Sequence, residues 1–293
     1  MLIDNMIFVV LMRLKGVDFY MFKVDNDKCT GCGQCIKDCF PRDIKLVEGK
    51  AKISNRTCMK CGHCIAVCPV AAVSTDDFNM ETVKDYNREE FLIDADKLLN
   101  FIKYRRTVRQ FKDKDVESEM LSKIIEAGRF TQTGSNRQDV SYIVVKEGLQ
   151  QLKTLAFESL KNIGEDMLAN LTPETRSYSI YAKMWLKMYE DFKNDPIKGD
   201  RLFFNAPAIV IVTADSAVNG ALASTNMELM TNALGLGTFY SGFFVMASQK
   251  SKDIMDFLEI KEGKHIVTCM VIGYPNIKYS RTVPRKEADI CWK

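Results

Sequence analysis

The sequence is poor in histidine, in long apolar runs and in net charge, and each shortage excludes a class of protein. Only two of its 293 residues are histidines, so no catalytic acid or base stands out. Its 41 Lys and Arg nearly balance its 38 Asp and Glu, giving a net charge of +3, which indicates no nucleic acid partner. A G-x-G-x-x-G turn after the first strand of the mixed α/β part is also absent, so a Rossmann dinucleotide fold is not supported.

The apolar run near the N-terminus, residues 6–12, is too short for a membrane span, which needs about 20 apolar residues. Asp4 precedes this run and Arg13 follows it, whereas a signal peptide has positive charge before its apolar run. We therefore expect no membrane association. Two interpretations of residues 1–21 stay open: an additional strand or helix, or an extension outside the native protein with Met21 as the true start.

Cysteine, by contrast, is abundant and ordered. Eight of the ten cysteines form two runs of the pattern C-x2-C-x2-C-x3-C, and each cysteine of the second run lies 29 residues after its counterpart in the first. Disulfide scaffolds are short and cysteine-rich throughout, and a zinc site needs only two C-x2-C pairs. The observed spacing is that of [4Fe–4S] ligands, in which three thiolates wrap one cluster and the fourth is free to hold a neighbouring cluster. Reduced thiolates favour a cytoplasmic location.

This region resembles the bacterial two-cluster ferredoxins. The resemblance implies two ligand sets, Cys29, Cys32, Cys35 and Cys68 for one cluster and Cys58, Cys61, Cys64 and Cys39 for the other. The first run departs from the family because Phe40 separates Cys39 from Pro41, which we expect to adjust a turn without removing a ligand. We expect no ligand role for His63, a buried structural thiol at Cys269 and a free thiol at Cys291.

The composition and the resemblance to the ferredoxins together predict four segments along the chain. They are an N-terminal extension (1–21), a two-cluster ferredoxin-like domain (22–80), an acidic linker (81–97) and a mixed α/β domain (98–293). In the small domain, β-like stretches should flank a turn at Glu48-Gly49. Its core is weak on its own, so bound clusters should supply most of its order.

In the larger domain, hydrophobic patterns predict several elements. A helix capped by Asp94 or Asp96 should bury Leu98, Leu99 and Ile102, and a second helix should begin at a capping Ser118. Residues 150–193 are helical in character. Buried strands are expected at 206–213 and 265–273, with a helix over 217–234 that ends at Gly235.

Four further motifs lie in the larger domain. They are Arg-Arg-Thr-Val-Arg-Gln-Phe at 105–111, Gln-Thr-Gly-Ser-Asn-Arg-Gln at 132–138, Ala-Leu-Gly-Leu-Gly-Thr-Phe-Tyr-Ser-Gly at 233–242, and Ile-Gly-Tyr-Pro at 272–275 followed by Arg281, Arg285 and Lys286. The first motif alone is compatible with a basic helix end, since cations favour that end.

In this order the motifs resemble those of the FMN-dependent nitroreductases over about residues 98–290. The first motif has Thr107 where the family commonly has serine, and Asp139-Val140 replaces a Pro-Trp pair, which leaves the wall of the substrate pocket in question. The resemblance implies an α+β domain with a central mixed sheet flanked by helices, FMN at the interface of a homodimer, and a set of FMN-binding residues. That set is Arg105, Arg106, Thr107, Arg109, Thr133, Ser135, Asn136, Gln138, Tyr240, Ser241, Gly242 and Arg285.

The chemistry of FMN suits these residue types. Arginine makes bidentate contacts with phosphate and keeps its charge, and a cation near the flavin N1 raises the flavin potential. Together the two halves indicate an oxidoreductase that takes electrons from ferredoxin or NAD(P)H through two [4Fe–4S] clusters to FMN. The acceptor would be a small electron-poor molecule such as a nitroaromatic, quinone or enone. An electron carrier or redox sensor without a substrate, and an enzyme of this fold with another chemistry such as reductive dehalogenation, are the alternatives.

Overall fold

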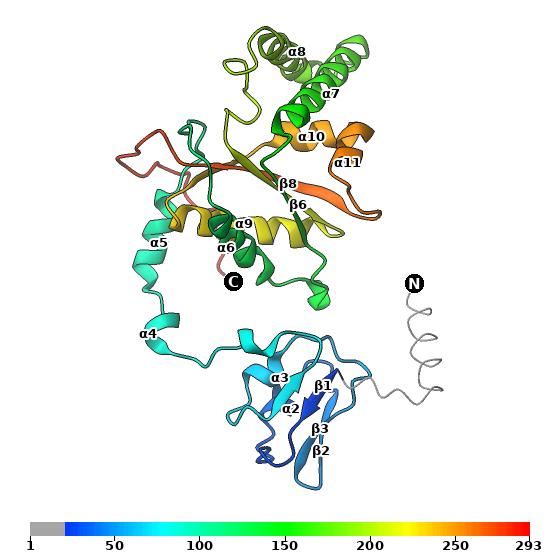
Figure 1. The fold of residues 1–293 in the computed structure, drawn as a ribbon, viewed down its shortest axis with the longest axis vertical. Coiled ribbons are helices and arrows are strands. Elements are labelled where there is room, and N and C mark those ends of the chain that lie inside the picture. Colours follow the sequence, from blue (N-terminus) through cyan, green and yellow to red (C-terminus); the bar gives the residue numbers. More distant parts are fainter. Residues whose placement is uncertain (1–20) are drawn as a thin grey trace. The chain divides into compact units, whose positions relative to one another are not determined.

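The structure is a computed structural model, and it describes residues 21–293, so residues 1–20 of the expected N-terminal extension lie outside the described residues. The chain divides into two compact units (Figure 1). The first runs up to Leu92 and includes Ser135–Arg137, and the second comprises Ile93–Gly134 and Gln138–Lys293. The division after Leu92 falls within residues 81–97, the range expected for a linker. The units are described separately below.

The first unit contains two small antiparallel sheets. Strand β1 (Phe22–Val24) pairs with β4 (Val73–Thr75), and β2 (Ile44–Val47) pairs with β3 (Lys50–Ile53). The β2–β3 turn is formed by Glu48 and Gly49, with φ angles of 52° and 77°. Left-handed conformations at both positions match the right-handed twist of a hairpin, so the predicted turn is confirmed.

Two short helices follow the tight loops that carry the cysteines. Helix α2 (Gln34–Asp38) begins after Gly33, and α3 (His63–Ala66) begins after Gly62. Both glycines are left-handed, with φ angles of 73° and 74°. The small apolar core contains Phe22, Ile44, Ala51, Ile53, Ala72 and Val73 together with cysteine side chains. Cysteines therefore form part of the packing of this unit.

The connecting segment contains a 3-10 turn, η1 (Met80–Thr82), and helix α4 (Arg88–Phe91). The second unit then begins with α5 (Ala95–Tyr104), which Asp94 caps by accepting a 2.8 Å hydrogen bond from the Lys97 amide. The prediction that Leu98, Leu99 and Ile102 would be buried is wrong for this chain, because they are 39%, 47% and 38% exposed. The amphipathic pattern identified an apolar face, but the rest of the described chain covers it only in part.

The second unit is built on a four-stranded sheet in the order β5-β6-β8-β7. Its strands are β5 (Ser141–Val145), β6 (Ala208–Ala214), β7 (Gly237–Tyr240) and β8 (His265–Gly273). All three ladders are antiparallel. Within residues 21–293, the parallel pairing expected of a mixed sheet is limited to the bridge between Thr107 and Thr238. The predicted strands at 206–213 and 265–273 are confirmed.

Helices cover both faces of this sheet, as Figure 1 shows. One face packs α7 (Leu149–Ala169), α8 (Ser179–Asn194), α10 (Gly242–Lys250) and α11 (Lys252–Phe257), and the other packs α6 (Ser118–Arg129) and α9 (Ala217–Ala233). Along β6, Ile209 and Ile211 enter the first core while Val210 and Val212 enter the second. The alternation follows from the period of two in a strand, and the result is an α+β fold.

Two helix predictions need adjustment. The helical stretch expected at 150–193 is divided into α7 and α8, and the turn between them contains Pro173, which disfavours helix at the residue before it, and the 3-10 turn η3 (Arg176–Tyr178). Ser118 is the first helical residue of α6 and not its cap, and Glu117 takes the cap position without a side-chain hydrogen bond. No helix within residues 21–293 has the length and apolar character needed to cross a membrane.

Candidate functional site

Four cysteine side chains line a cavity in the first unit, where the empty space, part of it open to solvent, is about 350 Å³. They are Cys29, Cys32 and Cys35 from the first run and Cys68 from the second. Cys35 lies in α2, whereas Cys68 lies just beyond the end of α3. We call this space the first cavity.

A second cavity, with about 350 Å³ of empty space that likewise includes open solvent, is lined by the other four cysteines of the runs. They are Cys58, Cys61 and Cys64 from the second run and Cys39 from the first. The structure therefore brings the eight cysteines together in the two crossed sets that the resemblance to the two-cluster ferredoxins implied. Their role as cluster ligands stays a prediction. Within residues 21–293, no three His, Cys, Asp or Glu side chains form a group that could hold a single metal ion.

Backbone amides approach three of these sulfurs. The amides of Ala51, Asp43 and Ala72 donate to the Sγ atoms of Cys29, Cys39 and Cys68 at 3.5, 3.4 and 3.2 Å. Hydrogen bonds to the thiolates of an iron–sulfur cluster stabilise negative charge and influence its reduction potential. Four thiols around one space, with backbone amides donating to several of the sulfurs, fit a polyatomic cluster.

The thiols differ in their acidity without metal. The amide of Ala51 lowers the pKa of Cys29, whereas burial raises the pKa of Cys58 and raises that of Cys64 to about 12. Negative charge on Asp43 is a further cause of the shift at Cys58. Iron binding at the second cavity must therefore displace protons from these thiols, since only thiolates coordinate metal.

In the second unit, the first arginine of the motif at 105–111 is held by an ion pair. Arg105 follows the last turn of α5, and its Nη1 lies 2.5 Å from Oε1 of Glu228 in α9. The Tyr240 hydroxyl, at the end of β7, donates to the Ser224 carbonyl at 2.7 Å and lies 3.5 Å from the second oxygen of Glu228. Burial raises the pKa of Tyr240, so its hydroxyl stays protonated. The structure therefore brings Arg105 and Tyr240 together through Glu228.

The rest of the same motif runs beside β7. The amide of Val108 donates to the Thr238 carbonyl at 3.0 Å, next to the bridge made by Thr107, and the exposed Arg109 places its guanidinium 5.5 Å from the ring centre of Phe239. Arg106 reaches back to the Lys103 carbonyl.

The C-terminal segment returns to this motif. The Tyr279 hydroxyl donates to the Thr107 carbonyl at 3.1 Å, and the Tyr104 hydroxyl donates to the Tyr279 carbonyl. Arg285 lies six residues further along and is exposed. This anchoring places residue 279, but not Arg285 itself, against the motif at 105–111.

The loop at 132–138 has an unusual backbone. Ser135, Asn136 and Gln138 have φ angles of 53°, 52° and 49°, which residues other than glycine rarely adopt and which concentrate at functional sites. Thr133 accepts a 2.9 Å hydrogen bond from the Gln138 amide. Within the first unit, to which residues 135–137 belong, the Asn136 amide group donates to the carbonyls of Met59 and Lys60 at 3.1 and 2.9 Å.

The remaining predicted positions lie where β7 leads into α10. Ser241 is buried, its amide donates to the Cys269 carbonyl at 2.9 Å, and its hydroxyl donates to the Leu202 carbonyl at 3.2 Å. Gly242 begins α10, and a methyl group there would meet open space. Ser241 is thus engaged in structural hydrogen bonds, while the helix start at Gly242 is accessible.

The profile of the nitroreductase family matches residues 102–274, which is more than half of the chain. The chain belongs to the nitroreductase family. A second profile, that of the 4Fe-4S dicluster domain, matches residues 21–76. The family domain therefore carries an iron–sulfur dicluster domain at its N-terminal side, and the fusion that the sequence motifs predicted is confirmed.

Two curated relatives and one solved structure illustrate the similarity. A protein of Methanothermobacter thermautotrophicus named as an NADH dehydrogenase/NAD(P)H nitroreductase is 24% identical over 189 residues, which is 61% of this chain and 77% of the relative. The 4-nitrobenzoate reductase of Pseudomonas putida is 27% identical over 189 residues, 58% of this chain and 82% of the relative. A nitroreductase structure with bound FMN from Bacteroides fragilis has a TM-score of 0.50 at 19% identity and covers 67% of this chain and 98% of its own.

Buried polar atoms without hydrogen-bond partners lie in two of the motifs, at 105–111 and at 233–242. Among the described residues, Nε of Arg105, Nε of Arg106 and the hydroxyl of Thr238 are buried without a hydrogen-bond partner. Buried donors without partners are rare in native proteins, and unsatisfied ones often mark the place of a ligand or water. Two guanidinium donors and a hydroxyl suit an anionic, oxygen-rich group such as a phosphorylated flavin.

Three residues of these sites were not predicted. Asp43 lines the second cavity, Glu228 holds Arg105, and Asp139 accepts hydrogen bonds from Asn219 at 2.7 Å and from the Ser216 amide at 3.1 Å. These hydrogen bonds offset burial and lower the pKa of Asp139, so a carboxylate ties the loop to the start of α9. A comparison of the two cysteine repeats at their 29-residue offset would have singled out Asp43, since Ala72 is its counterpart.

Gly31→Ala is expected to damage the first cavity more than Gly33→Ala. Both glycines are left-handed, which costs an L-residue about 1–2 kcal/mol. A methyl group on Gly31 would also lie 2.1 Å from the Gly49 carbonyl oxygen, whereas one on Gly33 meets open space. Because Gly49 contributes backbone at this contact, the loop between Cys29 and Cys32 must move. Iron content and thermal unfolding of anaerobically purified protein provide the measurement, and equal losses in the two variants would contradict this expectation.

Proposed function

We propose that this oxidoreductase takes electrons from a low-potential donor, ferredoxin or NAD(P)H, and reduces a small electron-poor acceptor such as a nitroaromatic, a quinone or an enone. Two [4Fe–4S] clusters and FMN would carry the electrons. In this proposal the iron–sulfur domain spans residues 22–80, the linker 81–97 and the flavin domain 98–293. Membership of the nitroreductase family and the dicluster domain support the reaction class, and the 4-nitrobenzoate reductase among the relatives supports a nitroaromatic acceptor.

The presence of two four-thiol cavities in one chain with a nitroreductase-family domain carries the proposal. A family enzyme that receives electrons only as hydride from a nicotinamide cofactor has no use for one-electron carriers. Clusters pass single electrons, whereas FMN, when bound, accepts electrons singly and delivers them in pairs. The dicluster domain thus suits a donor that supplies one electron at a time.

The chain's own residues would bind FMN through the motifs at 105–109, 133–138 and 240–242 and through Arg285. The FMN-bound state of the Bacteroides fragilis structure supports flavin as the ligand of this fold. In this arrangement Glu228 orients Arg105. The buried Nε–H groups of Arg105 and Arg106 lack an acceptor among the described residues, and FMN would supply one. No side chain here is assigned as a catalytic acid or base.

A homodimer is part of the proposal. Leu98, Leu99 and Ile102 on α5 leave an apolar face exposed, and exposed apolar patches of this kind commonly mark interfaces. A second copy of the chain would cover this face. Sedimentation equilibrium measures the molecular mass of the assembly and so tests whether a dimer forms. A cytoplasmic location follows from the need to keep eight thiols reduced.

The decisive experiment is an anaerobic purification followed by donor-specific assays. Iron, acid-labile sulfide and extractable FMN are measured first, and reduction is then followed separately with reduced ferredoxin and with NAD(P)H. We expect Cys32→Ala to lose ferredoxin-dependent turnover, while the exposed Cys291→Ala variant retains it. Zinc in place of iron, or a colourless protein without FMN, would refute the proposal. Unchanged ferredoxin-dependent turnover in Cys32→Ala would refute the route through the clusters.

Arg109→Ala is expected to weaken FMN binding at least about tenfold, since an arginine–phosphate contact is a charge-assisted hydrogen bond and a tenfold change is about 1.4 kcal/mol. Arg109 is exposed beside β7, and within residues 21–293 it forms no salt bridge that would have to break before it binds. Arg129→Ala is the matched control, because Arg129 is paired with Glu126 at 2.7 Å on α6. Fluorescence titration of FMN into flavin-free protein measures both, and equal affinities would exclude Arg109 from the site.

A further inference from the structure

The two cavities are related residue by residue through the 29-residue repeat. Val24, Cys29 and Val73 of the first cavity correspond to Ile53, Cys58 and Ile44 of the second. The backbone repeats as well, because the Asp25 amide donates to the Ala72 carbonyl at 2.8 Å and the Ser54 amide donates to the Asp43 carbonyl at 2.9 Å. Differences at matched positions are therefore differences between two otherwise equivalent environments.

The matched pair Asp43 and Ala72 breaks this equivalence most strongly. Both residues line their cavity and both donate a backbone amide to the sulfur of the crossed cysteine. Ala72 has no polar side chain, whereas Asp43 is an acid that is only 6% exposed. The second cavity thus has a carboxylate at a position where the first has a methyl group.

One oxygen of this carboxylate is fully engaged and the other is free. Oδ1 of Asp43 accepts hydrogen bonds from the Thr57 hydroxyl at 3.0 Å, the Thr57 amide at 3.2 Å, the Arg56 amide at 3.3 Å and the Ser54 hydroxyl. Oδ2 is buried and has no hydrogen-bond partner among the described residues. These donors stabilise the charged form of the carboxylate, and within residues 21–293 no Lys, Arg or His forms a salt bridge with Asp43.

The first half of the repeat shows that such a turn does not require an acid in the cavity. There, Asp25 accepts from the amides of Asp27 and Lys28 at 3.0 and 3.2 Å, and these amides correspond to those of Arg56 and Thr57. Asp25 is exposed and does not line the first cavity. Turn stabilisation alone therefore does not explain why the acid of the second half is buried against the cysteines.

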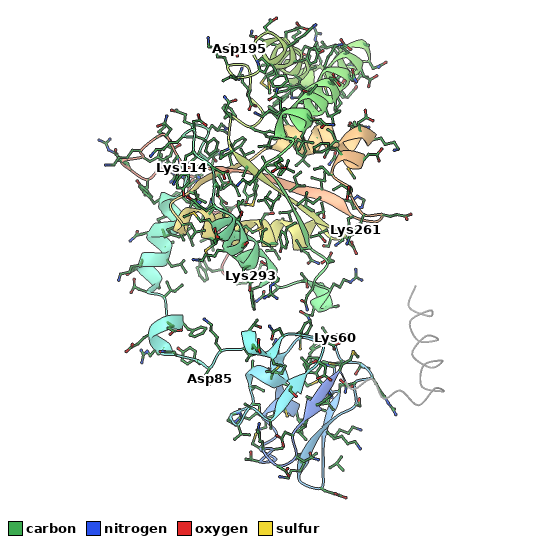
Figure 2. The ribbon with its side chains drawn as sticks, in the orientation of Figure 1. Lys60, Asp85, Lys114, Asp195, Lys261 and Lys293 are labelled. Carbon is green, nitrogen blue, oxygen red and sulfur yellow. The ribbon has the colours of Figure 1, made fainter. Side chains whose placement is uncertain are left out.

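The first cavity has a positive charge close by, whereas the second has the negative charge of Asp43. Lys50 Nζ donates to the Cys29 carbonyl at 2.6 Å, and the repeat places the uncharged Met21 at the corresponding position of the other half. Two side chains of the second cysteine run, those of Lys60 and His63, have acidic partners. Lys60, labelled in Figure 2, lies 3.5 Å from Asp77, and Nδ1 of His63 lies 3.0 Å from Asp38.

We propose that Asp43 and Lys50 give the two clusters unequal reduction potentials, the lower at the second cavity and the higher at the first. The inference rests on the proposed function, which supplies the clusters. Reduction adds one electron, and therefore one negative charge, to a cavity, without a change in bonds or protons. A buried carboxylate opposes that charge and a nearby ammonium favours it, and burial limits the screening of the carboxylate by solvent. A single electron entering the domain accordingly settles at the first cavity.

Potentiometric titration followed by electron paramagnetic resonance tests this proposal without turnover. The two clusters of the wild-type protein, followed by their own paramagnetic signals and apart from any flavin signal, should be reduced in two one-electron steps. In Asp43→Asn, which preserves an oxygen acceptor for the turn, the lower step should rise and the upper should stay. We expect the reduced-to-oxidised ratio of that cluster to increase about tenfold at fixed potential, equivalent to about 59 mV for one electron. In Lys50→Gln, the upper step should fall and the lower should stay.

The double variant D43A/S54D is the matched control for the fold. Because position 54 corresponds to Asp25, it moves the acid to the turn, as in the first half, and keeps the net charge. It should raise the lower step as Asp43→Asn does. A lower step that stays in place in either variant with full iron overturns the inference. If neither variant holds full iron, an upper step that does not fall in Lys50→Gln overturns it.

The failure of this inference can be distinguished from the failure of the proposed function. Wild-type protein without iron and sulfide would refute both, since no potentials would exist to differ. Wild-type protein with both clusters but with unmoved steps in the variants would refute only the role of Asp43 and Lys50.

Discussion

Cys68→Ala should lose roughly half of the iron and sulfide of the protein, because each cluster of this type needs four thiolate ligands. The structure places Cys68 in the first cavity, although it belongs to the second run. The surviving cluster should therefore be that of Cys58, Cys61 and Cys64. Iron and sulfide analysis of anaerobically prepared protein measures the loss, and Cys291→Ala, a change at an exposed thiol, should retain the full content.

The identity of the surviving cluster separates the crossed arrangement from one in which each run binds its own cluster. Under the crossed arrangement, Cys68→Ala removes the cluster of the first cavity, and Asp43 lines the second cavity, where the remaining cluster lies. Adding Asp43→Asn to Cys68→Ala should therefore shift the potential of the remaining cluster. Adding the same change to Cys39→Ala leaves the potential unaltered. Loss of the same cluster in Cys68→Ala and Cys61→Ala would contradict the crossed assignment.

Asp200→Ala is expected to cost the second unit about 3–5 kcal/mol of unfolding free energy, the range for breaking a buried ion pair. Oδ2 of Asp200 lies 2.7 Å from Nζ of Lys153, and the two side chains are 0% and 8% exposed. The same carboxylate accepts hydrogen bonds from the amides of Leu202, Phe203 and Asn205 at 3.1, 2.8 and 2.9 Å. Its removal leaves an unpaired ammonium and three amides inside the protein.

Denaturant unfolding followed by tryptophan fluorescence measures this loss, because Trp185 is buried in the same core as α7 and α8. Asp191→Ala is the matched control. Asp191 forms a 3.0 Å pair with Lys187 on the surface of α8, and such a pair contributes at most about 1 kcal/mol. Equal unfolding free energies for Asp200→Ala and Asp191→Ala would show that the buried Lys153–Asp200 pair contributes no more to stability than the surface Lys187–Asp191 pair.

Local spacing allowed the sequence to predict much of this protein. The cysteine runs, the Glu48-Gly49 turn and the strand at 265–273 each depend on residues close together in the chain, and each has a recognisable period or turn signal. The family motifs added the α+β fold, because several of them occur in a fixed order. These features therefore needed no knowledge of long-range contacts.

The unpredicted features depend on long-range packing. Glu228 lies 123 residues from Arg105, and Asn219 lies 80 residues from Asp139, so no local pattern connects them. The exposure of Leu98, Leu99 and Ile102 is a similar case, since periodicity shows which residues share a face but not what covers it. The binding roles of the cysteines and of the arginines remain predictions, which the cofactor analyses above will test.

Helix α9 contributes to two of the motif segments at once. Asn219, in its first turn, accepts a 3.2 Å hydrogen bond from the Gly134 amide, and Glu228 pairs with Arg105. Nine residues of helix separate these two side chains, a rise of about 13–14 Å. The helix thus fixes the spacing between the contacts of Asn219 and Glu228. A single residue inserted between them in α9 would turn one of these side chains away from its partner while the other contact stayed in place.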